Sequence, residues 1–216
     1  DCDIIIVETN FSLANWTLTV ADAIDYVFTV ADSLDKPAVV NTSVGSYLGS
    51  HDGLDPASLI VDSLLKDKPG RIVVAAMGNS GTWGDYHVQT NVDLDTSFTW
   101  FEVNSALTVP AVIFDVWADT ADFRNVEFAF GADAVSPDFE FRGRTKFFAI
   151  DTLLNQITED SIMNSNNKLS PISFYAEEIN GVYHLEVFLE NPDSSDYFYR
   201  CMTTGNGSFD LWGGIF

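Results

Sequence analysis

Basic residues are scarce in this sequence. Its 216 residues include 10 Lys and Arg against 32 Asp and Glu, so the formal charge is 10 − 32 = −22. Proteins that bind nucleic acid or an anionic membrane need basic patches, and this charge argues against both partners. The sequence also has no window of about 18 uninterrupted apolar residues, so it predicts no transmembrane helix.

Cysteine and histidine are scarce as well, with two and three residues respectively. Cys2 and Cys201 are too few to indicate a redox compartment, and because they fall in different predicted domains we expect no disulfide between them. The sequence has no H-x-x-x-H pair and no Cys/His cluster, which argues against transition-metal ligation. We expect His51 to order a loop, and His87 and His184 to be surface or satisfied core histidines.

The hydrophobic and aromatic content is that of a folded protein, and it differs between two parts of the chain. With 46% hydrophobic and 13% aromatic residues, the chain is not a disordered acidic tail. Residues 1–81 contain 5 of the 29 aromatics and a charge of 4 − 11 = −7, whereas residues 82–216 contain the other 24 and a charge of 6 − 21 = −15. This shift predicts two domains, residues 1–81 and 82–216. The second domain carries most of the acidity.

The first part alternates between strand and helix signals. The apolar run at residues 4–7 predicts a strand buried on both faces. Apolar residues at helical spacing over 20–34 predict a helix that ends before Lys36-Pro37, and residues 38–40 predict the next strand. Asp55-Pro56 is a strong helix start, and residues 72–76 form a third strand signal. The pattern predicts a partial parallel α/β layer with right-handed crossovers.

The second part shows short alternating runs typical of strands. Asn180-Gly181 between two such runs predicts a β-hairpin, and residues 151–170 are polar and weakly patterned, so we expect a loop there. The number of short strands predicts an all-β domain, an antiparallel jelly-roll β-sandwich. The predicted strands cover residues 87–94, 98–103, 112–118, 126–130, 146–150, 172–177, 183–189, 197–202 and 209–212.

Two stretches of the first part carry a family resemblance. Residues 75–81 read AAMGNSG after a buried strand, and residues 39–45 read VVNTSVG upstream of them. Together they resemble the subtilisin-like serine proteases (subtilases), whose corresponding strands have the forms V-V-A-A-A-G-N-x-G and V-I-N-x-S-L-G. Residues 50–53 (SHDG) resemble the G-P-H-D-G stretch of a bacterial branch that carries a jelly-roll domain inserted after the oxyanion strand. The aromatic segment begins at that position, and residues 203–212 resemble the end of the insert.

The resemblance implies roles for five residues. Asn79 corresponds to the asparagine of the oxyanion hole, whose side-chain amide donates to the oxygen that becomes negative during acyl transfer. Ser43, Val44 and Gly45 correspond to the strand end that runs alongside the substrate backbone and could pair with an extended peptide. Gly78 belongs to the same substrate site and allows a tight turn beside the amide. The alternatives are that Asn79 is only a turn residue and that Ser43 to Gly45 are an ordinary strand exit.

The catalytic triad of the subtilases is missing from the sequence. None of the motifs D-[ST]-G, H-G-x-H and G-T-S-x-[AS] occurs in it. In the family's order the aspartate and histidine precede these strands and the serine follows the insert, so we expect an internal fragment that is inactive by itself. The partners implied are polypeptide substrates of the intact endopeptidase and the remainder of the parent chain. The resemblance also implies a bacterial protein that is secreted or part of the cell envelope.

Two other functions remain open on the sequence alone. The aromatic sandwich could be a carbohydrate- or protein-binding module, which exposed rows of Trp or Tyr would favour, or the parent could be an inactive pseudoprotease. No cofactor is expected. The acidic pairs Asp93-x-Asp95 and Asp119-x-x-Asp122 offer oxygen ligands for Ca²⁺, but no EF-hand-like loop surrounds them, and we expect solvated acidic loops.

Overall fold

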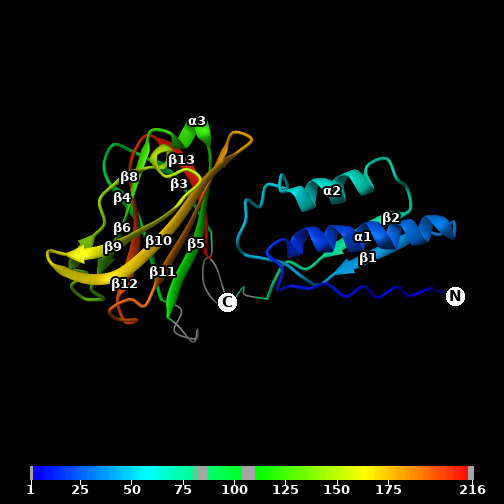
Figure 1. Ribbon diagram of the computed structural model, residues 1–216, viewed down its shortest axis with the longest axis horizontal. Coiled ribbons are helices and arrows are strands. Elements are labelled where there is room, and N and C mark those ends of the chain that lie inside the picture. The colour runs from blue at the N-terminus through cyan, green and yellow to red at the C-terminus, as the bar shows by residue number, and fades with distance from the viewer. Residues whose placement is uncertain (1, 80, 82–86, 104–109, 214–216) are drawn as a thin grey trace. The chain divides into compact units, whose positions relative to one another are not determined.

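The computed structural model describes residues 2–79, 81, 87–103 and 110–213, and these fall into two compact units (Figure 1). The first unit comprises Asp1–Ser46 and Ser50–Thr82, and the second comprises Tyr47–Gly49 and Trp83–Phe216. The domain boundary expected after Gly81 stays a prediction. Within the described ranges, no helix has both the length and the apolar character needed to cross a membrane.

The described residues of the first unit form two helices and a small parallel sheet. Its elements, in chain order, are α1 (Trp16–Ser33), β1 (Ala38–Thr42), α2 (Pro56–Leu65) and β2 (Arg71–Ala75). The strands β1 and β2 pair in parallel register, with Val40 opposite Val73. These four elements confirm the helices and two of the three strands predicted for this part of the sequence.

Local sequence signals explain both helices. One face of α1 is buried, and its spacing of three or four residues is that of an amphipathic helix: Ala21, Ile24, Phe28 and Ala31. The carboxylate of Asp55 accepts hydrogen bonds from the backbone N–H groups of Ala57 (3.0 Å) and Ser58 (3.2 Å), which caps α2 as predicted.

The strand predicted at residues 4–7 is wrong. These residues form no strand, and Ile4 and Ile6 are 82% and 90% exposed. An apolar run becomes a buried strand only where neighbours pair with it and cover both of its faces. In the described part of the first unit, β1 and β2 pair only with each other.

The described residues of the second unit form an antiparallel sheet of eleven strands that curves round until it is nearly closed (Figure 1). The hydrogen-bonded order is β3-β13-β5-β11-β10-β9-β7-β6-β12-β4, with β8 beside β6. The predicted antiparallel β class is confirmed, and the finer jelly-roll topology stays a prediction. The elements are β3 (His87–Val92), β4 (Ser97–Phe101), β5 (Ala111–Asp119), α3 (Thr120–Phe123), β6 (Val126–Asp133), β7 (Phe141–Arg144), β8 (Phe148–Ala149), the 3-10 helix η1 (Ile150–Thr152), β9 (Ile157–Asn164), β10 (Asn167–Ile179), β11 (Val182–Glu190), β12 (Phe198–Gly205) and β13 (Gly207–Gly213).

The core of the second unit is rich in phenylalanine. Phe128, Phe130, Phe148 and Phe174 are all at most 5% exposed, and their ring centroids lie 4.9 to 6.1 Å apart in tilted and edge-on arrangements. Such arrangements are the favoured ones for aromatic pairs. The aromatic composition of residues 82–216 therefore builds the interior of this unit.

The hairpin predicted at Asn180-Gly181 is confirmed. It joins β10 to β11 with Ile179 opposite Val182, and both turn residues have positive φ angles (+52° and +86°). Two consecutive residues with positive φ are the requirement of a type I′ turn, which Asn-Gly meets well.

The loop expected over residues 151–170 is wrong. Strand β9 and the start of β10 lie in this range and pair with each other, with Asn164 opposite Asn167. The pairing buries Ile162 completely and Leu169 to 7% exposure. The polar residues on either side of Ile162 gave this strand a weak apolar pattern. The pairing that stabilises it comes from other strands of the sheet, and a local pattern does not show it.

Candidate functional site

The residues predicted to form a site follow the carboxyl ends of β1 and β2. Thr42 and Ala75 are opposite each other at these ends, and the N–H of Ala76 donates to the carbonyl oxygen of Thr42 (3.0 Å). Because the strands are parallel, the segments 43–45 and 76–79 leave the sheet at the same edge. Ligands of open α/β sheets commonly bind at the carboxyl ends of their strands.

The backbone at this edge is arranged by short polar contacts and one glycine. The amide of Asn41 donates to Oγ of Ser43 (3.2 Å), and the hydroxyl of Thr42 donates to the carbonyl oxygen of Val74 (3.2 Å). Gly78 has φ +92°, a conformation that strains residues with a Cβ. It turns the chain immediately before Asn79, which lies on the exposed surface. The catalytic and binding roles of these residues stay predictions.

A pocket of about 520 Å³ lies within the first unit, beside the end of β1. Ser43 and Val44 contribute to its lining, together with residues of the N-terminal segment 5–11 and of α1. The four residues of α1 that line it are all aliphatic, Ile24 among them. The structure thus brings two of the five predicted residues to a cavity, while Gly45, Gly78 and Asn79 are not part of its lining.

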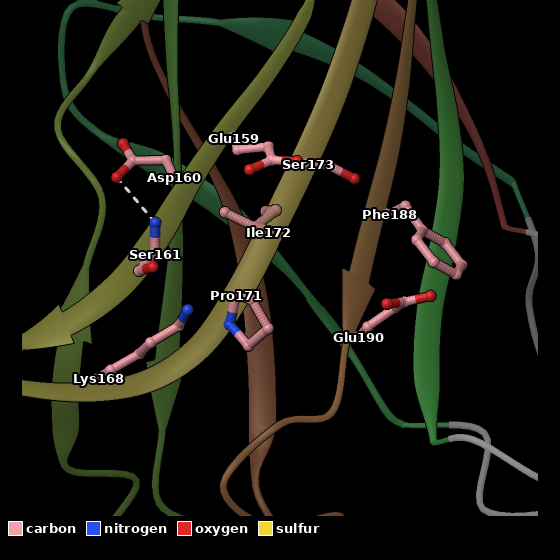
Figure 2. Close-up of a pocket in the computed structure, with 9 residues that line it drawn as sticks. All are labelled: Glu159, Asp160, Ser161, Lys168, Pro171, Ile172, Ser173, Phe188 and Glu190. Atoms are coloured by element: carbon pink, nitrogen blue, oxygen red, sulfur yellow. Dashed lines mark hydrogen bonds between the residues drawn. The ribbon is translucent and has the colours of Figure 1, made fainter.

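A second hollow, of about 350 Å³, lies over β9, β10 and β11 (Figure 2). Three carboxylates (Glu159, Asp160 and Glu190) and Lys168 contribute to its lining, and Asp160 accepts a hydrogen bond from the N–H of Ser161 (2.7 Å). A hollow of this kind is a solvated acidic surface, and its side chains suggest no acyl-transfer chemistry.

An exposed aromatic patch occupies another part of the second unit. We call it the Trp100 patch, and it consists of Phe98, Trp100, Phe139, Phe141 and Phe198. The ring of Trp100 is stacked with those of Phe139 (5.3 Å between centroids) and Phe198 (5.4 Å). Four of the five members are 40 to 49% exposed, namely Phe98, Trp100, Phe139 and Phe141.

A buried ion pair fixes the orientation of the Trp100 ring. Trp100 Nε1–H donates to Asp133 Oδ2 (2.7 Å), and Arg200 donates to both oxygens of the same carboxylate. Asp133 is fully buried, and the guanidinium of Arg200 lies over the ring of Phe98 (4.2 Å). An exposed indole held in one orientation is a ready stacking platform.

His51 and Asp119, two of the residues considered in the sequence, lie in locally hydrogen-bonded segments. His51 has φ +53° in a loop where the Asp52 carboxylate accepts hydrogen bonds from the Ser50 hydroxyl (2.6 Å) and the Leu54 N–H (2.8 Å). Asp119, which the sequence left open as a calcium ligand, caps α3 by accepting from the N–H of Ala121 (2.8 Å).

One group of side chains was missed in the sequence. Asp115, His184 and Glu186 lie together on β5 and β11, although His184 was expected to be a surface or satisfied core histidine. Two signals were available: Asp115 interrupts an apolar strand, and His184 and Glu186 share a strand face because they are two residues apart. The pairing of β5 with β11, which unites them, could not be read from the sequence.

Comparisons with known proteins show a fold and no family. No family model matches the chain, and neither does any curated protein. Among solved structures, the chain is similar to the Clostridium perfringens CspB protease, with a TM-score of 0.66 and 16% sequence identity over 91% of this chain. At this identity the likeness supports a distant subtilisin-like fold. The match covers 40% of the protease chain, so the present sequence corresponds to less than half of it.

Proposed function

We propose that this chain forms part of a subtilisin-like serine endopeptidase and supplies its oxyanion-hole asparagine, Asn79. The observation that carries the proposal is the parallel pair β1 and β2, whose carboxyl ends lead into Ser43 to Gly45 and into Gly78-Asn79 at one edge. The likeness to a protease fold and the two sequence stretches that resemble subtilase strands support it.

The chemistry explains why an amide is required at this edge. Peptide hydrolysis by a serine protease passes through a tetrahedral intermediate, in which the former carbonyl oxygen carries a negative charge. A neutral amide held beyond a rigid strand donates to that oxygen without reorganising. The nucleophilic serine, the histidine that accepts its proton and the aspartate that orients the histidine would come from other segments of the parent protein.

The segment Ser43 to Gly45 would hold the substrate backbone. Ser43 and Gly45 are exposed and lie beyond the last paired residues of β1. Both facts support the proposal that their backbone groups pair with an extended peptide. Side chains of such a peptide would find an apolar surface in the neighbouring pocket, which Val44 helps to form.

The experiment is a comparison of two variants in the intact protein that contains these residues. We expect Asn79→Ala to lower kcat by about 10²–10³-fold with little change in KM, a magnitude measured on a subtilisin and carried over to this site. Asn166→Ala is the control, because Asn166 is an exposed asparagine in the turn between β9 and β10, and this variant should keep nearly full activity. Equal kcat values for the two variants would contradict the role of Asn79.

A serine-directed phosphonate separates the remaining alternatives. The intact protein should react with it and hydrolyse a chromogenic peptide, while the 216-residue chain should do neither. An intact protein that folds but fails to react would be a pseudoprotease. Hydrolysis by the 216-residue chain, blocked by the phosphonate, would place the nucleophile within these residues and overturn the proposal.

The Trp100 patch favours a second candidate function, the binding of carbohydrate. Its exposed, oriented indole can stack on the apolar face of a sugar ring. A glycan array probed with the 216-residue chain tests this, with Trp100→Ala expected to abolish binding. Tyr26→Ala is the control, because Tyr26 is an aromatic residue on α1 that is even more exposed than Trp100 (57% against 42%). The absence of glycan binding by the unaltered chain would remove this candidate.

A further inference from the structure

Two histidine–tryptophan stacks lie on one face of the second unit. His184 on β11 stacks on Trp117 of β5 with 4.1 Å between centroids, and His87 on β3 stacks on Trp212 of β13 with 4.0 Å. Each histidine has an aspartate nearby on the adjacent strand, Asp115 beside His184 and Asp210 beside His87. The two arrangements are chemically alike and can be compared directly.

The two histidines differ in how their ring nitrogens are used. His87 Nε2 lies 2.7 Å from an oxygen of Asp210, within hydrogen-bonding distance. His184 bonds through its other nitrogen, Nδ1, to Glu177 Oε1 (3.0 Å). His184 Nε2 is buried and forms no hydrogen bond with any residue that the structure describes. A buried polar atom without a hydrogen bond is unfavourable, so this nitrogen requires an explanation.

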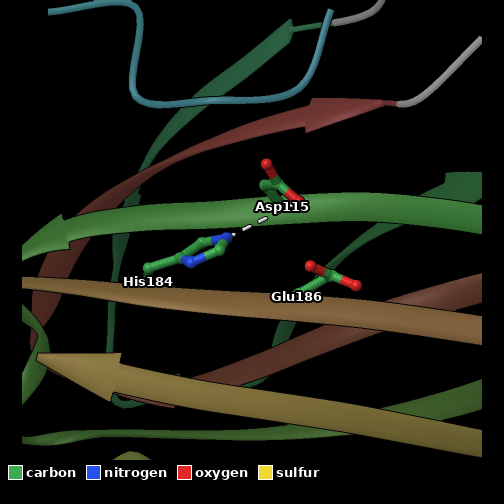
Figure 3. Close-up of side chains that lie close together, drawn as sticks. All are labelled: Asp115, His184 and Glu186. Carbon is green, nitrogen blue, oxygen red and sulfur yellow. Dashed lines mark ion pairs between the residues drawn. The ribbon is translucent and has the colours of Figure 1, made fainter. Parts of the chain in front are cut away.

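Two carboxylates lie beside the buried nitrogen. Asp115 Oδ1 is 3.7 Å from His184 Nε2, while Asp115 Oδ2 accepts a hydrogen bond from the N–H of Gly49 (2.9 Å). Glu186 lies directly opposite Asp115 in the strand register, and one ligand atom from each of the three side chains lies within 4.8 Å of the others. Figure 3 shows Asp115 on β5 close to His184 and Glu186 on β11.

We propose that Asp115, His184 and Glu186 bind a divalent transition-metal ion such as Zn²⁺. Zinc takes imidazole nitrogen and carboxylate oxygen at about 2.0–2.2 Å, so two ligands of one tetrahedral ion lie roughly 3–4 Å apart. The 3.7 Å between His184 Nε2 and Asp115 Oδ1 fits this spacing. Glu186 is exposed and can move to complete the set.

The surroundings of the ligands support a metal site. Metal-binding histidines commonly donate their second N–H to a carboxylate, which fixes the ring and directs the free nitrogen at the ion. Glu177 does this for His184, and the hydroxyl of Tyr175 in turn donates to Glu177 (3.4 Å). Imidazole among the ligands selects a transition metal over Ca²⁺ or Mg²⁺, which prefer oxygen alone.

The competing occupant of His184 Nε2 is a proton. Burial lowers the pKa of His184, but Asp115 and Glu177 outweigh burial, and the pKa lies above its ordinary value. An imidazolium between two carboxylates would need no metal. The two accounts differ in a simple observable, because only a metal site saturates at one ion per chain.

Isothermal titration of the metal-free 216-residue chain with ZnCl₂ at pH 8 tests the proposal. We expect one Zn²⁺ per chain, loss of this binding in His184→Gln, and weakening by about 10–100-fold in Glu177→Gln. His87→Gln is the matched control and should bind like the unaltered chain. Circular dichroism in EDTA checks that each variant folds. Glu186→Gln provides a second test on an exposed residue if His184→Gln does not fold, and it should weaken binding at least tenfold.

Three results would overturn the proposal. Titration of the folded chain without saturation at one ion would leave the imidazolium account standing. Equal loss of binding in His184→Gln and His87→Gln would show adventitious binding to surface histidines, and undiminished binding in Glu186→Gln would exclude the three-ligand site.

Discussion

The sheets of the two units differ greatly in how much of their apolar surface is buried. In the second unit the sheet is nearly closed, and its apolar side chains meet in one interior. In the first unit one face of the two-stranded sheet lies exposed, with Val39, Ile72 and Val74 at 68, 54 and 48% exposure. A sheet is stabilised by the burial of its faces, so the difference implies that core interactions stabilise the second unit more strongly.

The largest effect should come from the aromatic core of the second unit. Phe128 is 1% exposed and packs against three other phenylalanine rings, so Phe128→Ala should lower the free energy of unfolding by about 3–5 kcal/mol. Hydrogen exchange followed by mass spectrometry should show lost protection across the second unit and little change in α1. Phe98→Ala, at a residue 47% exposed, is the control and should have a much smaller effect.

A polar network in the second unit should make its stability depend on pH. Arg142 donates to both carboxylate oxygens of Asp193, and the hydroxyl of Tyr199 donates to Asp193 Oδ1 (3.0 Å). Burial alone would raise the pKa of Asp193, but hydrogen bonds from Arg142 and Tyr199 outweigh it, and the pKa lies below its ordinary value.

A lowered pKa in the folded state fixes the sign of the pH dependence. The stabilisation is complete above the unfolded pKa of about 3.9 and is lost as the pH falls through the lower folded value. Asp193→Asn should therefore lower the free energy of unfolding by about 1–3 kcal/mol at pH 7 and flatten its decline below about pH 4. Asp22→Asn on α1, an exposed position, should leave the urea-unfolding profile unchanged. Parallel pH profiles for the Asp193 variant and the unaltered protein would contradict this account.

Features encoded by neighbouring residues were predictable from the sequence. The Asp55 cap, the hairpin at Asn180-Gly181 and the apolar face of α1 each depend on residues a few positions apart. The same holds for the edge that leads into Ser43 and Asn79, because two strand signals separated by a helix predict parallel pairing.

Features that depend on distant pairing were not predictable. Strand β9 was expected to be loop because its alternation is weak, and only β10 and β7 beside it make it a strand. The error at residues 4–7 was the opposite one, because a strong apolar pattern predicted a strand that the structure does not form. An apolar pattern does not show whether a partner strand is present. His184 was not expected to belong to a site, because Asp115 lies close to it only as a result of the pairing of β11 with β5.

A moderate effect, confined to the first unit, should follow loss of the α2 cap. Asp55→Ala leaves the N–H groups of Ala57 and Ser58 without this acceptor and should lower the free energy of unfolding by about 1 kcal/mol. Faster hydrogen exchange in the first turn of α2, with the strands of the second unit unchanged, is the expected result. Asp62→Ala on the exposed side of the same helix is the control. Equal effects of the two substitutions would mean that the cap contributes nothing.

The smallest effect tests the comparison between the units most directly. Ile72 lies on the exposed face of β2, so Ile72→Thr should change the free energy of unfolding by no more than about 0.5 kcal/mol. The same substitution at Ile162, which is fully buried in the second unit, should lower it by about 2–4 kcal/mol, because it removes apolar packing and buries a hydroxyl. Urea unfolding of both variants measures the difference. If Ile72→Thr proves as destabilising as Ile162→Thr, the face of β1 and β2 is covered in solution, and the contrast between an open and a closed unit does not hold.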